Sequence, residues 1–189
     1  MISHLVNSQH LVHHDLNLMR PNFASVIEEL SLLTVLHEFT PRVIGTPPLG
    51  IDIATSDIDI ACSTDDLARF QCVTTDRFGE CDRFQFRQIN IQNHKTFIAQ
   101  FHAHDWDIEL FCQSVPTDRQ WGVRHFIVEQ RLIAIDPNLK FAILVLKQQG
   151  MKTEPAFANV LNLIGDPYQA MLKLENMDDD DLKQLLDKR

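Results

Sequence analysis

The chain has 189 residues, 44% of them hydrophobic and 23% charged, which are the size and composition of one ordinary globular domain. Its formal net charge of −9 argues against a grip on long nucleic acid, which usually needs a basic surface. No apolar run reaches the ~18 residues that span a membrane, and no basic, then apolar, secretory signal opens the chain. We therefore expect no long nucleic acid and no membrane as partners, while the composition leaves the oligomeric state open.

The four cysteines show no CxxC spacing, which argues against a zinc ribbon or a thioredoxin motif. Reduced, buried thiols in a cytoplasmic protein are the simplest interpretation. The residues concerned are Cys62, Cys72, Cys81 and Cys112.

The first part of the chain predicts helix, strand and loop in turn. Residues 1–22 hold four histidines without regular spacing, and we interpret them as a surface helix or arm rather than a metal site. Apolar spacing predicts an amphipathic helix over residues 23–39, ended by Pro41. A first strand over residues 42–45 leads into a loop rich in proline and glycine, and a second strand follows over residues 57–62.

A helix, three strands and several helices are expected next. Ser63 and Asp66 resemble a capping box that opens a helix to about Arg77, with Gly79 ending it. Three strands then form an antiparallel meander. Helices complete the chain, and an acidic run at residues 178–181 is expected to be solvated. The ranges are strands 84–91, 96–101 and 106–111, then helices 119–135, 138–149, 155–163 and 167–174.

This order predicts an α+β fold in which helices back a mixed β-sheet and the C-terminal part is helical. We divide the single expected domain into an arm (1–22), an α/β core (23–116) and a helical part (117–189).

Two aspartates alternate with isoleucine on the second expected strand. Because successive side chains of a strand point to opposite faces, Asp57 and Asp59 share one face and Ile58 and Ile60 the other. Two neighbouring carboxylates repel each other, and a divalent cation is the usual way to offset that cost. A solvated strand end is the alternative interpretation of the pair.

Gly45-Thr46, followed about a dozen residues later by Asp-x-Asp on a hydrophobic strand, resembles the signature of the DNA polymerase β-like nucleotidyltransferase superfamily. Thr46 stands where that signature has glycine or serine. The string from Gly45 to Ile60 looks like that of DUF4269, a family of small bacterial proteins assigned to the same fold. The resemblance runs from about Phe39 to Leu174 and is more specific for the fold than for a reaction.

The resemblance implies a site as well as a fold. It implies that Asp57, Asp59 and Glu109 hold Mg²⁺ or Mn²⁺, with Asp107 as the competitor for the third position and either acid of that strand as a base. Nucleotidyl transfer uses such metal ions to hold a nucleoside triphosphate and activate the attacking oxygen. Gly45, Thr46, Ser56 and Lys152 are the implied nucleotide-binding residues, and Lys152 opens a Lys-Thr-Glu-Pro-Ala-Phe string also found in the family.

Three residues of the expected helix over 119–135 are possible substrate contacts. His125 and Glu129 are four residues apart and share a helix face, and Arg124 could meet a phosphate. An ordinary surface or half-buried pair is the alternative interpretation, as is a surface charge for Arg124. Asp52 could support the site, although a loop aspartate more often forms a turn.

Other chemistries fit the sequence less well. His102-Ala-His104-Asp105 lacks the spacing and the last histidine of a zinc-hydrolase motif. Ala61 stands where a haloacid-dehalogenase-type phosphatase has threonine or valine, and a glycosyltransferase Asp-x-Asp is a weaker match still.

Two functions follow as hypotheses. The first is a metal-dependent nucleotidyltransferase that acts on a small-molecule or protein hydroxyl. The second is a non-catalytic module of the same fold, for example a toxin–antitoxin component.

Overall fold

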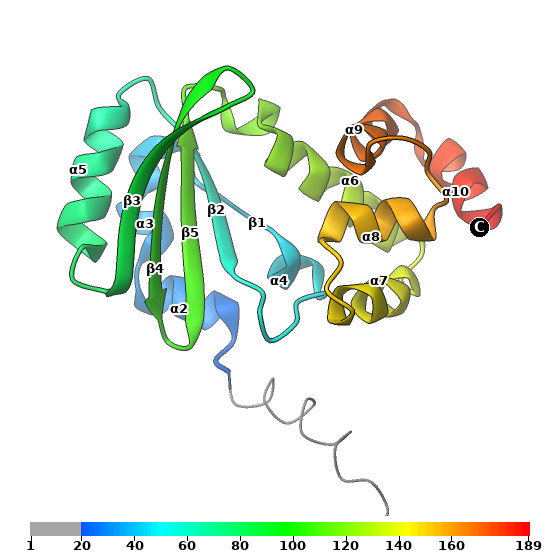
Figure 1. The fold of residues 1–189 in the computed structure, drawn as a ribbon, viewed down its shortest axis with the longest axis horizontal. Helices are drawn as coiled ribbons and strands as arrows, with labels where there is room; N and C mark the ends of the chain where they lie inside the picture. The colour runs from blue at the N-terminus through cyan, green and yellow to red at the C-terminus, as the bar shows by residue number, and fades with distance from the viewer. Residues whose placement is uncertain (1–19) are drawn as a thin grey trace, which may run out of the picture.

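The structure, a computed structural model, describes residues 20–189, and these form a five-stranded mixed sheet with helices on one face and beyond one edge (Figure 1). The strand order is β1-β2-β5-β4-β3; β2 and β5 run parallel, and the other neighbours run antiparallel. The strands are β1 (Arg42–Ile44), β2 (Ile58–Ser63), β3 (Asp82–Ile91), β4 (His94–Ala103) and β5 (Trp106–Gln113). The α+β mixed sheet and the antiparallel meander of β3 to β5 are confirmed. Of the expected arm, residues 1–19 with their histidines lie outside the described residues.

The register of the central strands decides which side chains lie together. Asp59 on β2 pairs with Glu109 on β5, and Glu109 pairs with Gln100 on β4. Paired residues of neighbouring strands point to the same face. One polar row therefore crosses three strands on a single face of the sheet.

The opposite face is covered by helices and forms the first hydrophobic core. Ile58, Ile60 and Cys62 alternate with the residues that point to the polar face of β2 and are fully buried here. Helix α5 packs on this face, and Phe78 stacks on Phe101 of β4 with ring centroids 4.7 Å apart. The covering elements are α2 (Phe23–Glu29), α3 (Leu32–Val35), the 3₁₀ turn η1 (His37–Phe39) and α5 (Leu67–Phe78).

The C-terminal helices pack together beyond the β1 edge around a second hydrophobic core (Figure 1). Leu49 and Ile51, which follow the Gly45 turn, are buried in this core. The loop between β1 and β2 is thereby fixed to the helical part as well as to the sheet. The helices are α6 (Trp121–Ile135), α7 (Leu139–Gln148), α8 (Thr153–Val160), α9 (Pro167–Lys173) and α10 (Asp179–Asp187), with 3₁₀ turns η2 (Thr117–Arg119) and η3 (Leu174–Asn176).

Some expected elements differ in the structure. The helix expected over residues 23–39 is broken at Ser31, which has a left-handed backbone (φ 56°). The proline-rich loop contains a short helix, α4 (Thr46–Leu49), because prolines suit a first helical turn. Ser63 is the last residue of β2 and does not cap α5; the Asp66 carboxylate accepts from the Arg69 amide instead.

Within residues 20–189 we find no helix with both the length and the apolarity to cross a membrane.

Candidate active site

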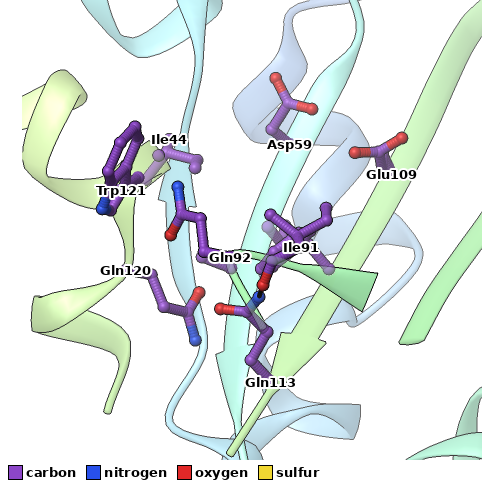
Figure 2. A pocket seen from close by; sticks show the side chains of 12 residues that line it. Ile44, Asp59, Ile91, Gln92, Glu109, Gln113, Gln120 and Trp121 are labelled. Atoms are coloured by element: carbon purple, nitrogen blue, oxygen red, sulfur yellow. Dashed lines mark hydrogen bonds between the residues drawn. The ribbon is translucent and has the colours of Figure 1, made fainter. Parts of the chain in front are cut away.

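Three carboxylates gather where β2 and β5 lie side by side. Asp57 immediately precedes β2, Asp59 lies within it, and Glu109 is the residue of β5 paired with Asp59. Figure 2 shows the side chains of Asp59 and Glu109 rising from neighbouring strands at the edge of one cavity. The parallel pairing of β2 with β5 thus brings together acids that are 50 residues apart in the chain.

The site is electrostatically unfavourable as it stands. Burial, followed by the charges of Asp57 and Glu109, raises the pKa of Asp59 well above its ordinary value. Burial and the Asp57 charge also raise the pKa of Glu109, while Arg87 and a hydrogen bond from Gln100 oppose that rise. The Asp57 charge therefore disfavours ionisation of both Asp59 and Glu109, and a bound cation would relieve this repulsion.

The donor chemistry of this cluster fits a hard divalent cation. Carboxylate oxygens are the ligands that Mg²⁺ and Mn²⁺ prefer. With the side chains as they lie, no three His, Cys, Asp or Glu residues among residues 20–189 converge tightly enough to hold a metal ion. Gln100 Nε2 donates to Glu109 Oε2 at 2.6 Å, and Arg87 Nη2 lies 3.4 Å from the same oxygen. Gln100 and Arg87 therefore bind the Glu109 carboxylate, which would be the third metal ligand beside Asp57 and Asp59.

Asp107, the competing third acid, has other partners. Its Oδ1 lies 2.8 Å from His102 Nδ1 and 3.1 Å from Arg83 Nη2, and its side chain is 66% exposed. Glu109, rather than Asp107, is the residue paired with Asp59. The geometry therefore favours Glu109 as the third carboxylate.

Gly45 lies directly against the carboxylate of Asp59. Its backbone has φ 79° and ψ −164°, a region essentially restricted to glycine, and any Cβ there would overlap Asp59 Oδ2. Beside it, Thr46 Oγ1 donates to Ser56 Oγ at 3.0 Å, and the Ile53 amide donates to the same Ser56 oxygen at 3.0 Å. Ser56 therefore braces the loop that carries Asp57, while Gly45 provides the close approach to Asp59.

Gly45→Ala should cost more stability than Gly165→Ala. Both glycines have positive φ, so both substitutions strain the backbone, by about 1–3 kcal/mol. Only position 45 adds a collision with Asp59, since an added Cβ at Gly165 meets nothing within 4 Å. Urea unfolding should show an excess loss of about 1–2 kcal/mol at position 45. Equal losses would mean that Asp59 moves aside freely and that Gly45 has no special role.

A polar cleft of about 570 Å³ opens from the carboxylates toward the helical part. The β1–β2 side forms one wall of the cleft and contributes all five of the site residues that were predicted there. The helical side contributes basic, acidic and imidazole groups. The polar lining includes Thr46, Ser56, Asp57, Asp59, His125, Glu129, Lys147, Lys152 and Glu154, and the Gly45 turn lies beside them.

Lys147 is the cation of this cleft that sequence reasoning did not select. It is buried, and its Nζ donates to Thr153 Oγ1 at 3.2 Å. Burial lowers the pKa of Lys147, and the charges of Glu129 and Asp57 oppose that change. Lys152, the predicted residue, lines the same cleft from an exposed position before α8. The sequence offers no signal that separates Lys147 from Lys140, the other lysine of the same helix.

His125 and Glu129 are buried at the cleft, whereas Arg124 points to a partner elsewhere. His125 Nε2 donates to the Tyr168 carbonyl at 2.9 Å, which leaves Nδ1 3.5 Å from Glu154 Oε1. Arg124 forms an ion pair with Glu175, with Nη2 to Oε2 at 2.6 Å.

Glu129→Gln should flatten the pH dependence of stability. Burial, and then the Glu154 charge, raises the pKa of Glu129 from 4.5 to about 8, although Lys147 opposes this. Between these values the folded protein holds a proton that the unfolded chain has released, so stability falls as pH rises and levels off above about 8. At one pKa unit per about 1.4 kcal/mol, the variant should gain about 2–4 kcal/mol over the parent by pH 8.5.

Urea unfolding at about pH 5, 6.5 and 8.5, which span the titration of Glu129, measures this gain. Glu28→Gln, at an exposed position of α2, is the matched control and should keep the parental profile. Parallel profiles for Glu129→Gln and its parent would show that Glu129 does not carry the proton.

Arg20 is a further residue that the sequence did not indicate. Its guanidinium donates to the carbonyls of Ile53 at 3.3 Å and Ala54 at 2.8 Å, and also to that of Ser56. The same group lies 3.0 Å from the ring centroid of Trp106 on β5. Arg20 thus ties the loop before Asp57 to the sheet.

Solved structures with a similar fold are nucleotidyltransferases. The Cid1 poly(U) polymerase with MgGTP bound has a TM-score of 0.53 at 11% identity, over 80% of this chain and 53% of that one. Cid1 with its short product ApU has a TM-score of 0.51 at 12% identity, over 86% of this chain and 51% of that one. A cytoplasmic RNA terminal U-transferase has a TM-score of 0.50 at 12% identity, over 80% and 50%. This chain spans about half the length of each, and the likeness shows the nucleotidyltransferase fold.

No curated protein matches the chain. The model of a family described as a domain of unknown function, DUF4269, matches residues 25–174, which is most of the sequence. The resemblance noted at the Gly45 and Asp57 motifs is therefore confirmed, and the chain belongs to the DUF4269 family.

Proposed function

We propose that this protein transfers a nucleotidyl group from a nucleoside triphosphate to a hydroxyl of a small molecule or protein. The observation that carries the proposal is the pairing of Asp59 with Glu109 on the open sheet face, with Gly45 against Asp59. The nucleotidyltransferase fold supports the reaction class.

The two sides of the cleft would bind different parts of the metal-nucleotide complex. Asp57, Asp59 and Glu109 would hold Mg²⁺ or Mn²⁺, which when bound supplies charge neutralisation for the triphosphate and activation of the attacking oxygen. On the other side of the cleft, Lys147 and Lys152 would attract the phosphates, and Thr46 would offer its hydroxyl. The cleft has four acids against two lysines, so a metal-nucleotide complex suits it better than free nucleotide.

The transfer step forms one bond and breaks one. The acceptor oxygen bonds to the α-phosphorus, the bond from that phosphorus to the oxygen bridging the β-phosphate breaks, and pyrophosphate leaves. The acceptor proton passes to the Glu109 carboxylate, which lies beside Asp59. Positioning and electrostatics supply most of the catalysis in such reactions, so the chain needs no covalent intermediate.

Calorimetric titration with ATP, with and without Mg²⁺, tests the proposal. Binding should require the metal, and at 100 times its dissociation constant the nucleotide should stabilise the fold by about 2.7 kcal/mol. Asp57→Asn should remove both effects. Metal-independent behaviour that is identical in Asp57→Asn would instead favour the non-catalytic module, with Glu109 held permanently by Gln100 and Arg87.

A further inference from the structure

A second cavity, of about 220 Å³, adjoins the carboxylates on the open face of the sheet. Its floor includes Ala61, two residues beyond Asp59 on β2, and Phe111 on β5. Ile91, at the end of the β3–β4 hairpin, and Trp121, at the start of α6, form further walls (Figure 2). This cavity and the polar cleft share Ile44, Asp59 and Gly122, so the two spaces meet at Asp59.

Gln120 brings a buried hydrogen-bond acceptor to this cavity. Its side chain is 3% exposed, and its Nε2 donates to the carbonyls of Cys62 at 2.7 Å and Val115 at 2.9 Å. These two bonds fix the amide orientation, because only the nitrogen can donate. Oε1 is buried and finds no hydrogen-bond partner within residues 20–189. Since buried acceptors are rarely left unpaired, this oxygen calls for a donor from a ligand or water.

Gln113 on β5 is a second buried glutamine whose amide nitrogen already donates within the fold. It is also 3% exposed, and its Nε2 donates to Thr96 Oγ1 at 2.8 Å and lies 3.5 Å from the Ile91 carbonyl. Its carboxamide oxygen is therefore the end left for the cavity. In Figure 2 the oxygens of Gln113 and Gln120 are turned toward each other. Two facing acceptors suit a group with hydrogens to donate, such as a hydroxyl or an amine.

Charge restricts the ligand further. The charged residues of the lining are Asp59 and Glu109, and both are acids. At the end of the cavity away from these acids, a phosphate or carboxylate would meet the acceptor oxygens of Gln113 and Gln120 and no positively charged side chain. The apolar walls of Trp121, Phe111 and Ile91 suit the face of a small ring. A neutral or cationic molecule fits, whereas the 3′ end of an RNA brings phosphates.

Size completes the description. A volume of 220 Å³ equals the share of about seven water molecules at ~30 Å³ each, and is below the roughly 300–1,000 Å³ of drug-sized pockets. One ring with its substituents fills such a space.

We propose that this cavity holds the acceptor of the transfer reaction, and that the acceptor is a single-ring polyol or amino-polyol. The inference rests on the proposed function. Donor groups of the ring would bond to Gln113 and Gln120, and a hydroxyl at the other end would reach Asp59 and Glu109. That oxygen would then attack the α-phosphorus of a nucleotide lying in the adjoining cleft, with pyrophosphate as the leaving group and the proton passing to Glu109.

Saturation-transfer NMR on the full chain with Mg²⁺ and α,β-methylene ATP tests the acceptor class. The probes are glucosamine, myo-inositol and glucose 6-phosphate. Wild-type protein should transfer saturation to the first two and not to the phosphorylated sugar. Ala61→Met fills the cavity and should reduce the signals at least about fivefold, with Ala61→Val intermediate and usable if the larger side chain impairs folding. Ser63→Met is the control, because it places the same side chain on the same face of β2 outside the cavity.

The outcomes separate the two proposals. If α,β-methylene ATP binds but neither glucosamine nor myo-inositol does, the acceptor inference is wrong and the transfer proposal stands. Equal binding of glucose 6-phosphate, or signals unchanged in Ala61→Met and Ala61→Val, also overturns the inference. Binding of the two probes that depends on Ala61, in a protein that binds no nucleotide, supports the cavity and overturns the transferase.

Discussion

Replacing Asp59 with asparagine is expected to abolish nucleotidyl transfer while making the metal-free protein more stable. Transfer should fall by about 10³-fold or more, the size of effect seen when a pre-organised electrostatic group is lost. Stability should rise by about 1–2 kcal/mol at pH 7, because a buried carboxylate facing Asp57 and Glu109 becomes neutral. A raised acid pKa destabilises the fold only while the unfolded chain is ionised, so the gain should shrink as the pH falls toward 3.8.

Asp59→Asn is informative because its transfer activity is expected to fall while its stability rises. An ordinary structural aspartate would lose stability when replaced, and an ordinary surface aspartate would change neither property. Asp107→Asn is the matched control, since Asp107 lies on β5 with an exposed side chain paired to His102 and Arg83. It should keep transfer within about twofold, the usual range for an exposed substitution away from a site. Urea unfolding without metal and label transfer from an α-labelled nucleotide measure the two effects. A destabilised Asp59→Asn that remains active would contradict both halves of the prediction.

Lys147→Met is expected to weaken nucleotide binding far more than Lys152→Met. A buried charge-assisted hydrogen bond to phosphate is worth about 1.5–3 kcal/mol, so affinity should fall by about 10- to 150-fold. Lys152 lies at an exposed position of the same cleft, where solvent weakens its interaction, and its loss should cost about fivefold or less. Methionine keeps most of the buried apolar stem of lysine, which limits the loss of packing.

Calorimetric titration with Mg-ATP ranks the two variants, and urea unfolding checks that Lys147→Met remains folded. Some loss of stability is expected, because Glu129 and Glu154 would lose a neighbouring positive charge. The reverse ranking, with Lys152→Met the weaker binder, would place the phosphates at the outer rim of the cleft. If both variants bind Mg-ATP as tightly as the parent, neither lysine of the helical side contacts the nucleotide.

The fold class, and half of the candidate site, could be proposed from the sequence because they follow from local chemistry. Alternation along a strand predicts that Asp57 and Asp59 share a face, and both line the same cleft although Asp57 lies just before β2. The choice between Asp107 and Glu109 could not be made in this way, because they share a face of β5. It required the register, in which Glu109, and not Asp107, stands opposite Asp59.

Residues brought in from other elements were not visible in the sequence. Lys147 looks like any lysine near a helix end until α7 packs beside the cleft, and Arg20 reaches its loop across more than 30 residues. The same holds for Gln113 and Gln120, whose carboxamide oxygens are left for the cavity only because their nitrogens donate to β4 and to the turn before α6. The apolar spacing predicted one continuous helix through Ser31. In the structure the helix breaks at Ser31, and Leu32 and Leu36 are buried by the separate turns that follow.

Titration with Mn²⁺, followed by electron paramagnetic resonance of the free ion in the presence of α,β-methylene ATP, tests most directly whether Asp57, Asp59 and Glu109 act as one cation site. Wild-type protein and Asp107→Asn should bind the ion alike, and Asp59→Asn and Glu109→Gln should each weaken binding by more than about tenfold, or 1.4 kcal/mol. Mn²⁺ binding that is the same in all four proteins, or absent from the wild type, would contradict the account.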